Sequence, residues 1–132
     1  MEDFKKKFIV DEDFDEKRII EYGEKLLPFC KISKKGEVLI KLENATAIEK
    51  VKLGLAARFV ANRVQSEIPA EIGADDLSNF LNIPKNQITA RLNELKDNKF
   101  AESVERGLFR INPRQLSAFL DEMEAKYRGP NS

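Results

Sequence analysis

The stretch LNIPKNQITARLNEL, residues 81–95, has the pattern of a short helix with an unusual outer face. Its apolar residues Ile88, Leu92 and Leu95 follow the spacing i, i+4 and i+7, which makes one narrow stripe. The other side carries amides, a hydroxyl and small or basic groups, where an ordinary surface helix alternates Glu and Lys. These outward residues are Lys85, Asn86, Gln87, Thr89, Ala90 and Asn93. Such a helix raises the question of what its short hydrogen-bonding groups contact.

The residues before this helix predict another short helix and a tight turn. Asp75 and Asp76 are acidic residues of the kind that stabilise a helix N-terminus. The inward stripe of this first helix is Leu77, Phe80 and Leu81. Asn82 can end it, because asparagine tolerates a left-handed backbone better than other non-glycine residues. Pro84 suits the first turn of the next helix, where no amide donor is needed, so we expect two short helices at a steep angle, the second over 84–97.

A two-stranded hairpin and a last helix follow along the chain. Residues 100–105 and 108–111 are typical of strands, with a tight turn at 106–107. Pro113 breaks the hairpin and begins a helix. The apolar positions of that helix are Leu116, Phe119, Leu120, Met123 and Tyr127. We give equal weight to two roles for this stripe, namely packing back on residues 46–64 and forming a dimer interface.

Residues 46–64 predict a central helix. The segment Thr46-Ala47-Ile48-Glu49 has the S/T-x-x-E form of a capping box, which marks a helix start. Apolar side chains then occupy two sides of the helix. They are Ile48, Val51, Leu55 and Phe59 on one side, and Leu53, Ala57, Val60 and Val64 on the other. A helix that is apolar on two sides is buried between layers, so we expect it to join the N-terminal residues to the rest through one continuous core.

Residues 1–44 predict an N-terminal extension made of a helix and a β-hairpin. Asp13 or Asp15 can cap the helix. The inward residues of this helix are Ile19, Ile20, Leu26 and Leu27. Alternating apolar residues predict a hairpin over 29–42, in which Cys30 is a small core residue.

Residues 46–112 resemble a winged-helix domain, a variant of the helix-turn-helix fold. Three segments carry the likeness: DLSNFLNIP at 76–84 for the second helix and turn, QITARLNEL at 87–95 for the recognition helix, and VERGLFRINP at 104–113 for the wing. They are especially similar to small archaeal winged-helix proteins. Each segment alone is a weak motif, and the three in this order and spacing are much more specific. Two departures from the family pattern are Asn82, where glycine is usual, and the shortness of the wing.

The sequence therefore predicts a mostly helical α+β protein in three parts. The parts are a helix and β-hairpin extension over 1–44, a winged helix-turn-helix domain over 45–112, and a C-terminal helix over 113–132. Residues 4–8 and 128–132 are expected to be a solvated start and a frayed end.

The resemblance implies that the protein binds double-stranded DNA, as a transcriptional regulator or a chromatin-associated factor. A helix fits the major groove, where Asn and Gln pair with adenine and a small Ala permits close approach to a thymine methyl. Lysine and arginine hold the flanking phosphates. The implied contacts lie on the helix 84–97 and the wing 100–111: Lys85, Asn86, Gln87, Thr89, Ala90, Arg91, Asn93, Lys96, Arg106 and Arg110. A homodimer through the C-terminal helix would double these contacts.

Charge gives this interpretation only modest support. Residues 82–114 carry seven basic and four acidic side chains, a net charge of +3, whereas the whole chain has 23 of each sign. Nonspecific DNA binding depends on the number of phosphate contacts. The alternative is an adaptor whose winged helix binds protein or RNA in a larger assembly such as RNA polymerase or the ribosome. The neutral charge and the unexplained residues 1–44 favour that alternative.

Composition argues against several other classes of protein. The 132 residues include no histidine and one cysteine, so the commonest general base and metal ligand is absent and no intramolecular disulfide forms. We expect no enzyme activity, no metal and no cofactor. The segment from Asp11 begins like an EF-hand calcium loop, but Glu16 and Tyr22 stand where that loop needs glycine and glutamate. The sequence has neither a membrane-length apolar run nor the apolar stretch of a signal peptide, so we expect a cytoplasmic location.

Overall fold

The capping box at Thr46 forms as the sequence predicts and begins the central helix, α3 (Ala47–Val64). The Thr46 hydroxyl accepts a hydrogen bond from the backbone N–H of Glu49 at 3.2 Å. The Glu49 carboxylate accepts one from the backbone N–H of Thr46 at 2.8 Å. Two backbone donors at the helix start, which have no partner within the helix, are satisfied in this way.

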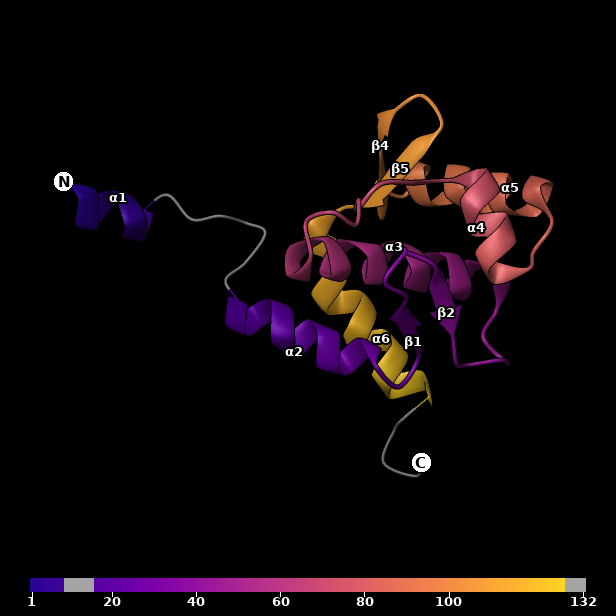
Figure 1. The fold of residues 1–132 in the computed structure, drawn as a ribbon, viewed down its shortest axis with the longest axis horizontal. Coiled ribbons are helices and arrows are strands. Elements are labelled where there is room, and N and C mark those ends of the chain that lie inside the picture. The colour runs from indigo at the N-terminus through magenta and orange to yellow at the C-terminus, as the bar shows by residue number, and fades with distance from the viewer. Residues whose placement is uncertain (9–15, 128–132) are drawn as a thin grey trace.

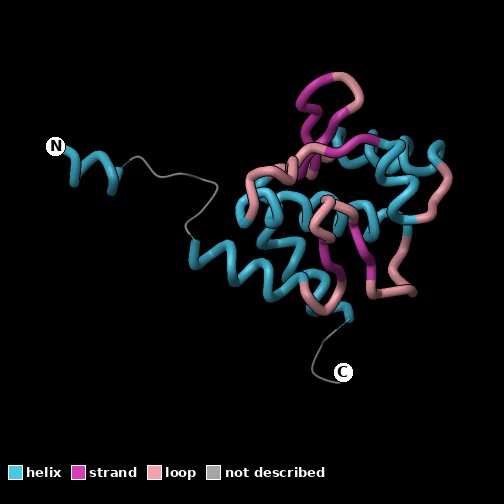
Figure 2. Tube along the Cα trace, in the orientation of Figure 1, coloured by secondary structure: helices cyan, strands magenta, loops and turns pink. Residues whose placement is uncertain are grey.

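A computed structural model describes residues 1–8 and 16–127 of the chain. Besides α3, its elements are α1 (Glu2–Phe8), α2 (Glu16–Leu26), β1 (Cys30–Ile32), β2 (Val38–Ile40), β3 (Ile72–Gly73), α4 (Ala74–Leu81), α5 (Lys85–Asp97), β4 (Ala101–Glu105), β5 (Leu108–Ile111), the 3-10 turn η1 (Pro113–Gln115) and α6 (Leu116–Tyr127). The strands form two small antiparallel sheets, β1-β2 and β3-β5-β4. The protein is thus a mostly helical α+β structure, drawn by element in Figure 1 and by type of secondary structure in Figure 2.

Helix α3 lies between the other elements of the fold. In Figure 1, α2 and α6 lie on one side of it, and α4, α5 and the β4-β5 hairpin lie on the other. Val51 and Leu55 on one side of α3 and Leu53 on the other are all 0% exposed. One hydrophobic cluster runs from α2 through α3 to α6, as the two apolar sides of this helix predict. The expectation for Val64 is wrong: it is 73% exposed, because the last turn of α3 borders an open groove.

Helix α2 buries a narrower face than the sequence pattern predicts, with Ile19 and Leu26 buried as expected. Ile20 and Leu27, expected to point inward, are 52% and 49% exposed. The residues buried on this helix are Ile19, Tyr22 and Leu26. These follow i, i+3 and i+7 on one face, and a residue one step along the chain lies about 100° further round the helix. The predicted caps Asp13 and Asp15 lie outside the described residues.

The N-terminal hairpin forms over the predicted segment. Strands β1 and β2 are antiparallel, with Cys30 opposite Ile40. Cys30 is 2% exposed and is a core residue, as the alternation predicts. Burial raises the pKa of its thiol to about 12, although the charge of Lys41 acts in the opposite direction. The neutral thiol is therefore the form present in the folded protein.

A buried arginine joins this hairpin to the segment before β3. Arg58 of α3 is 6% exposed, and its guanidinium donates a hydrogen bond to the carbonyl of Gly36 at 2.9 Å. It also donates to the carbonyls of Pro69 at 2.6 Å and Glu71 at 3.1 Å. Burial lowers the pKa of Arg58, while the charges of Asp76 and Glu71 raise it. One side chain thus binds three carbonyls in two backbone segments, the N-terminal hairpin and the residues before β3.

The apolar stripe of the last helix packs within the chain. The buried members of the stripe are Leu116, Phe119, Leu120 and Met123, each at most 3% exposed. Phe119 meets Phe100 edge to face, with ring centroids 5.4 Å apart. Of the two roles considered for this stripe, packing back on the chain is the one observed.

Glu49 fastens the end of α6 to the start of α3. Its carboxylate accepts hydrogen bonds from the Lys126 ammonium at 2.7 Å and the Tyr127 hydroxyl at 2.5 Å. Burial raises the pKa of Glu49, but the hydrogen bonds from Lys126, Tyr127 and the Thr46 backbone, with the charge of Lys126, outweigh burial and lower the pKa to about 2. The folded state therefore strongly favours the ionised form of Glu49.

The first residues form a short helix with apolar side chains facing solvent. Phe4 and Phe8 of α1 stack with ring centroids 5.3 Å apart, and they are 60% and 73% exposed. The expected solvent exposure of this segment is observed for both phenylalanines. The expected frayed end over 128–132 lies outside the described residues.

Candidate nucleic-acid interface

The turn between α4 and α5 has the left-handed residue that the sequence predicts. Asn82 has φ 56° and ψ 47°, and its backbone N–H donates to the carbonyl of Ser78. The N–H of Ile83 donates to the same carbonyl at 3.3 Å, and the Ser78 hydroxyl donates to the carbonyl of Ile83 at 2.7 Å. Pro84, expected in the first turn of α5, instead immediately precedes the helix with ψ 140°. These bonds fix how α5 leaves α4.

Helix α5 buries the predicted apolar stripe and leaves the opposite face open. Ile88, Leu92 and Leu95 are 0%, 1% and 0% exposed. The exposed residues from the predicted contact set are Lys85, Asn86, Gln87, Thr89, Ala90, Asn93 and Lys96. Figure 1 shows α5 on the side of α3 away from α2 and α6, so neither of these helices covers this face.

The hairpin of β4 and β5 stands beside α5 and carries the other two predicted contacts. Arg106 in the turn and Arg110 on β5 are both exposed. Gly107 has φ +81°, a left-handed conformation that side-chain-bearing residues rarely adopt. An irregularity in the pairing between residues 103 and 105 leaves Val104 42% exposed. The turn is thus a short basic projection next to the open helix face.

Strand β3 attaches this hairpin to the start of α4. Gly73 is the second residue of β3 and pairs with Leu108 of β5. A Cβ atom at Gly73 would lie 3.0 Å from the carbonyl oxygen of Gly107. The lack of a side chain therefore permits the close approach between the two backbones.

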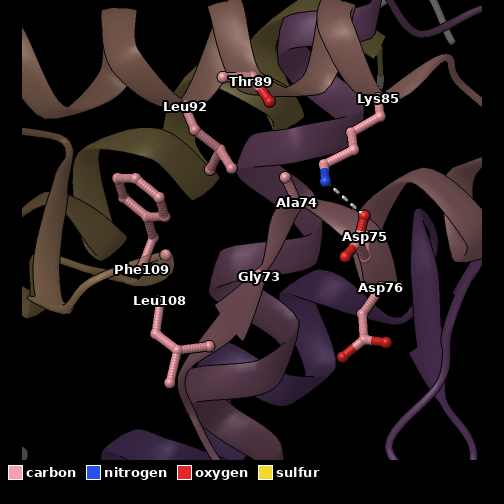
Figure 3. A pocket seen from close by; sticks show the side chains of 10 residues that line it. Gly73, Ala74, Asp75, Asp76, Lys85, Thr89, Leu92, Leu108 and Phe109 are labelled. Atoms are coloured by element: carbon pink, nitrogen blue, oxygen red, sulfur yellow. Dashed lines mark ion pairs between the residues drawn. The ribbon is translucent and has the colours of Figure 1, made fainter.

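A cleft of about 590 Å³ lies between α5, β5 and the start of α4. Lys85 reaches from α5 to the carboxylate of Asp75 on α4, as Figure 3 shows. Leu92, Leu108 and Phe109 supply an apolar side to the same cleft (Figure 3). The cleft separates the exposed helix face from the hairpin, so a molecule that touches both elements passes over it.

Carboxylates neutralise part of the positive charge on this surface. Three of the five predicted basic contacts form ion pairs with neighbouring acidic groups. The pairs are Lys85–Asp75 at 2.9 Å, Arg91–Glu94 at 2.9 Å and Arg110–Glu102 at 3.2 Å. Within residues 1–8 and 16–127, Lys96 and Arg106 take part in no ion pair. These two residues are therefore the free cations of the predicted set in the described chain.

Arg91 differs from the other predicted contacts. Its side chain is 35% exposed, and its Nε atom is buried without a hydrogen-bond partner in the described chain. Its terminal nitrogen reaches Glu94 one turn along α5. The structure thus places Arg91 at the edge of the open face of α5 and not on it.

The sequence did not predict the carboxylates or the cleft on this surface. Asp75 lies at the start of α4, as its sequence position predicts, and it also pairs with Lys85. Glu102 lies directly opposite Arg110 in the register of β4 and β5. The alternation of the hairpin strands was a usable signal for the second pair, because opposite charges on facing positions attract across a sheet.

The chain matches no protein-family model, no curated protein and no solved structure. No helix among the described residues has the length and apolar character needed to cross a membrane. The same residues contain no cluster of three or more Cys, Asp or Glu side chains arranged to hold a metal ion. The chemistry of the surface must therefore be argued from its own side chains.

Proposed function

We propose that this protein binds double-stranded DNA by placing the exposed face of α5 in the major groove. The β4-β5 hairpin would then act as a wing along the DNA backbone, which makes residues 45–112 a winged-helix domain. The observation that carries the proposal is an open helix face of amides and small groups, flanked by an exposed basic turn. A transcriptional regulator or a chromatin-associated factor would use such a surface.

Each part of the surface has a distinct role under this proposal. Asn86, Gln87 and Asn93 carry amides that can pair with base edges, above all with adenine. Ala90 lets the helix approach closely where a thymine methyl projects into the groove. Lys96 contacts phosphates beside the helix, and its charge is not neutralised by a neighbouring carboxylate within the described chain.

The proposal is tested by measuring binding to short DNA duplexes over a range of salt concentrations, using fluorescence anisotropy. Counterion release makes the logarithm of affinity fall with the logarithm of salt by about 0.9 for each phosphate contact. The double variant Lys96→Ala, Arg106→Ala removes two free cations, so its salt dependence should be weaker by about 1.8 in slope. Asn86→Ala with Gln87→Ala should instead reduce sequence preference while leaving that slope nearly unchanged.

The matched control for the charge variant is Lys17→Ala with Lys31→Ala, two exposed lysines on α2 and β1. It changes the net charge by the same amount at positions away from α5. An equal loss of affinity in this control would mean that the duplex binds through the net charge of the protein and not through Lys96 and Arg106. Failure of the unaltered protein to bind duplex at low salt would end the proposal.

The second candidate is an adaptor that binds protein or RNA in a larger assembly. This candidate is favoured by the ion pairing of three cations on α5 and β5, and by the equal numbers of basic and acidic residues in the chain, 23 of each. Under this candidate, duplex binding is negligible near physiological salt, and an affinity pull-down recovers one defined partner whose capture depends on Asn86 and Asn93.

A further inference from the structure

We propose that Asp75, Glu94 and Glu102 are specificity-determining residues that suppress binding to arbitrary DNA sequences. The inference rests on the DNA-binding function proposed above and concerns how that same surface is regulated by its own charge. Each carboxylate holds a cation that would otherwise be available to a phosphate. Binding then depends more on base contacts made by the amides of α5.

The three carboxylates belong to different elements, yet each one pairs with a cation that lies on this surface or, for Arg91, at its edge. Asp75 lies in the first turn of α4, and its side chain is 77% exposed. Glu94 lies on α5 and Glu102 on β4, with side chains 51% and 44% exposed. The pairs thus occur on the helix before the turn, on the proposed reading helix and on the hairpin.

The exposure of these pairs shows that they are poorly suited to stabilising the fold. An ion pair in water gains little, because solvent and salt screen the attraction and the side chains lose freedom. The carboxylates also repel an approaching phosphate backbone, and that repulsion acts on every DNA sequence alike. Because this repulsion lowers the affinity for every sequence, only duplexes whose bases pair with the amides of α5 are still bound tightly.

Of the three carboxylates, Asp75 is placed to repel a DNA backbone most strongly. It lines the cleft between α5 and the hairpin, where it meets Lys85 at 2.9 Å. A DNA backbone that contacts both α5 and Arg106 passes over that cleft. The negative charge of Asp76, which also lines the cleft, adds to the same repulsion. Figure 3 shows both carboxylates on the α4 side of the cleft.

The test compares the unaltered protein with the triple variant Asp75→Asn, Glu94→Gln, Glu102→Gln. These substitutions keep the size of each side chain and remove only its charge. The matched control is Asp121→Asn, Glu122→Gln, Glu124→Gln on exposed positions of α6, which changes the net charge equally. Thermal melting of each variant verifies folding. The DNA probes are a random-sequence duplex and the sequence enriched from a random pool by the unaltered protein.

We expect the triple variant to bind the random duplex more tightly, with a steeper dependence on salt. Three released cations steepen the slope by about 2.7, so its advantage over the unaltered protein grows by about 40-fold between roughly 200 and 50 mM salt. The ratio of affinities for the enriched and random duplexes should fall. The control variant should change that ratio little.

Two results would overturn the inference while leaving the proposed function intact. One is selective binding by the unaltered protein together with unchanged random-duplex binding in the triple variant. The other is an equal gain in the control variant, which would assign the effect to net charge. If neither the unaltered protein nor the triple variant binds any duplex at low salt, the proposed function itself fails.

Discussion

Glu49 offers a direct test of how the C-terminal helix is held, through the substitution Glu49→Gln. The pKa of this carboxyl falls from 4.5 to about 2 in the folded protein. Because the folded pKa is below the unfolded value, the resulting stability is fully present above about pH 4.5 and is lost as the pH falls through about 2. A difference of this size corresponds to about 3 kcal/mol at neutral pH, at about 1.4 kcal/mol per pKa unit. The Glu49 side chain is 11% exposed but that of Lys126 is 52% exposed, so solvent screens part of the attraction and lowers the expected contribution to about 1–3 kcal/mol.

The assay is urea unfolding of the unaltered protein and of Glu49→Gln at neutral and strongly acidic pH. We expect Glu49→Gln to lose about 1–3 kcal/mol near pH 7 and to approach the stability of the unaltered protein near pH 2. Glu122→Gln, on an exposed position of α6, is the control and should change stability by less than about 0.5 kcal/mol. A loss below about 1 kcal/mol at neutral pH, or an equal loss at both pH values, would refute the assigned role of Glu49.

Three further predictions concern the core and the turn. Arg58→Met should destabilise the protein by at least about 3 kcal/mol in denaturant melts, because three carbonyl acceptors lose their donor. Full stability in Arg58→Lys would contradict this, because a lysine ammonium cannot reproduce the planar geometry with which the guanidinium donates to three carbonyls. Asn82→Gly should leave the melting temperature nearly unchanged, whereas Asn82→Val should cost roughly 1–2 kcal/mol, because φ is 56°. Cys30, 2% exposed and with a pKa of about 12, should resist a thiol reagent near pH 8 until the chain unfolds; rapid labelling of the native protein would rule out that environment.

Local signals account for the features that the sequence predicted well. The capping box at Thr46 and the left-handed Asn82 depend on neighbouring residues, and both are present in the structure. The apolar stripe of α5 depends only on helical spacing and is also observed. In each case the information lies within a few positions along the chain.

The features that the sequence did not predict depend on residues distant along the chain. Ile20 is as apolar as Ile19, and only the position of the neighbouring layers decides which of them is buried. Arg58 bonds to carbonyls 11 to 22 positions away, so no local pattern marks it as a core residue. The partner of Lys85 is likewise known only once α4 and α5 are placed together.

For the candidate site, the sequence identified the exposed side chains but not the charges around them. The structure leaves the amide-rich face of α5 uncovered, which the helical spacing of Ile88 and Leu92 implies. The spacing of basic residues cannot reveal that Arg110 faces Glu102 across a hairpin. Counting basic residues in the sequence therefore overstates the number of cations that are available to bind a ligand.

The measurement that tests DNA binding at this surface most directly is an NMR titration of the ¹⁵N-labelled protein with duplex DNA. We expect shifts to concentrate on the exposed face of α5, including the side-chain amides of Asn86 and Asn93, and on the turn at Arg106. Amides of α2 and α6 should change little. Shifts confined to α2 and α6, or a spectrum unchanged by duplex at low salt, would contradict this expectation.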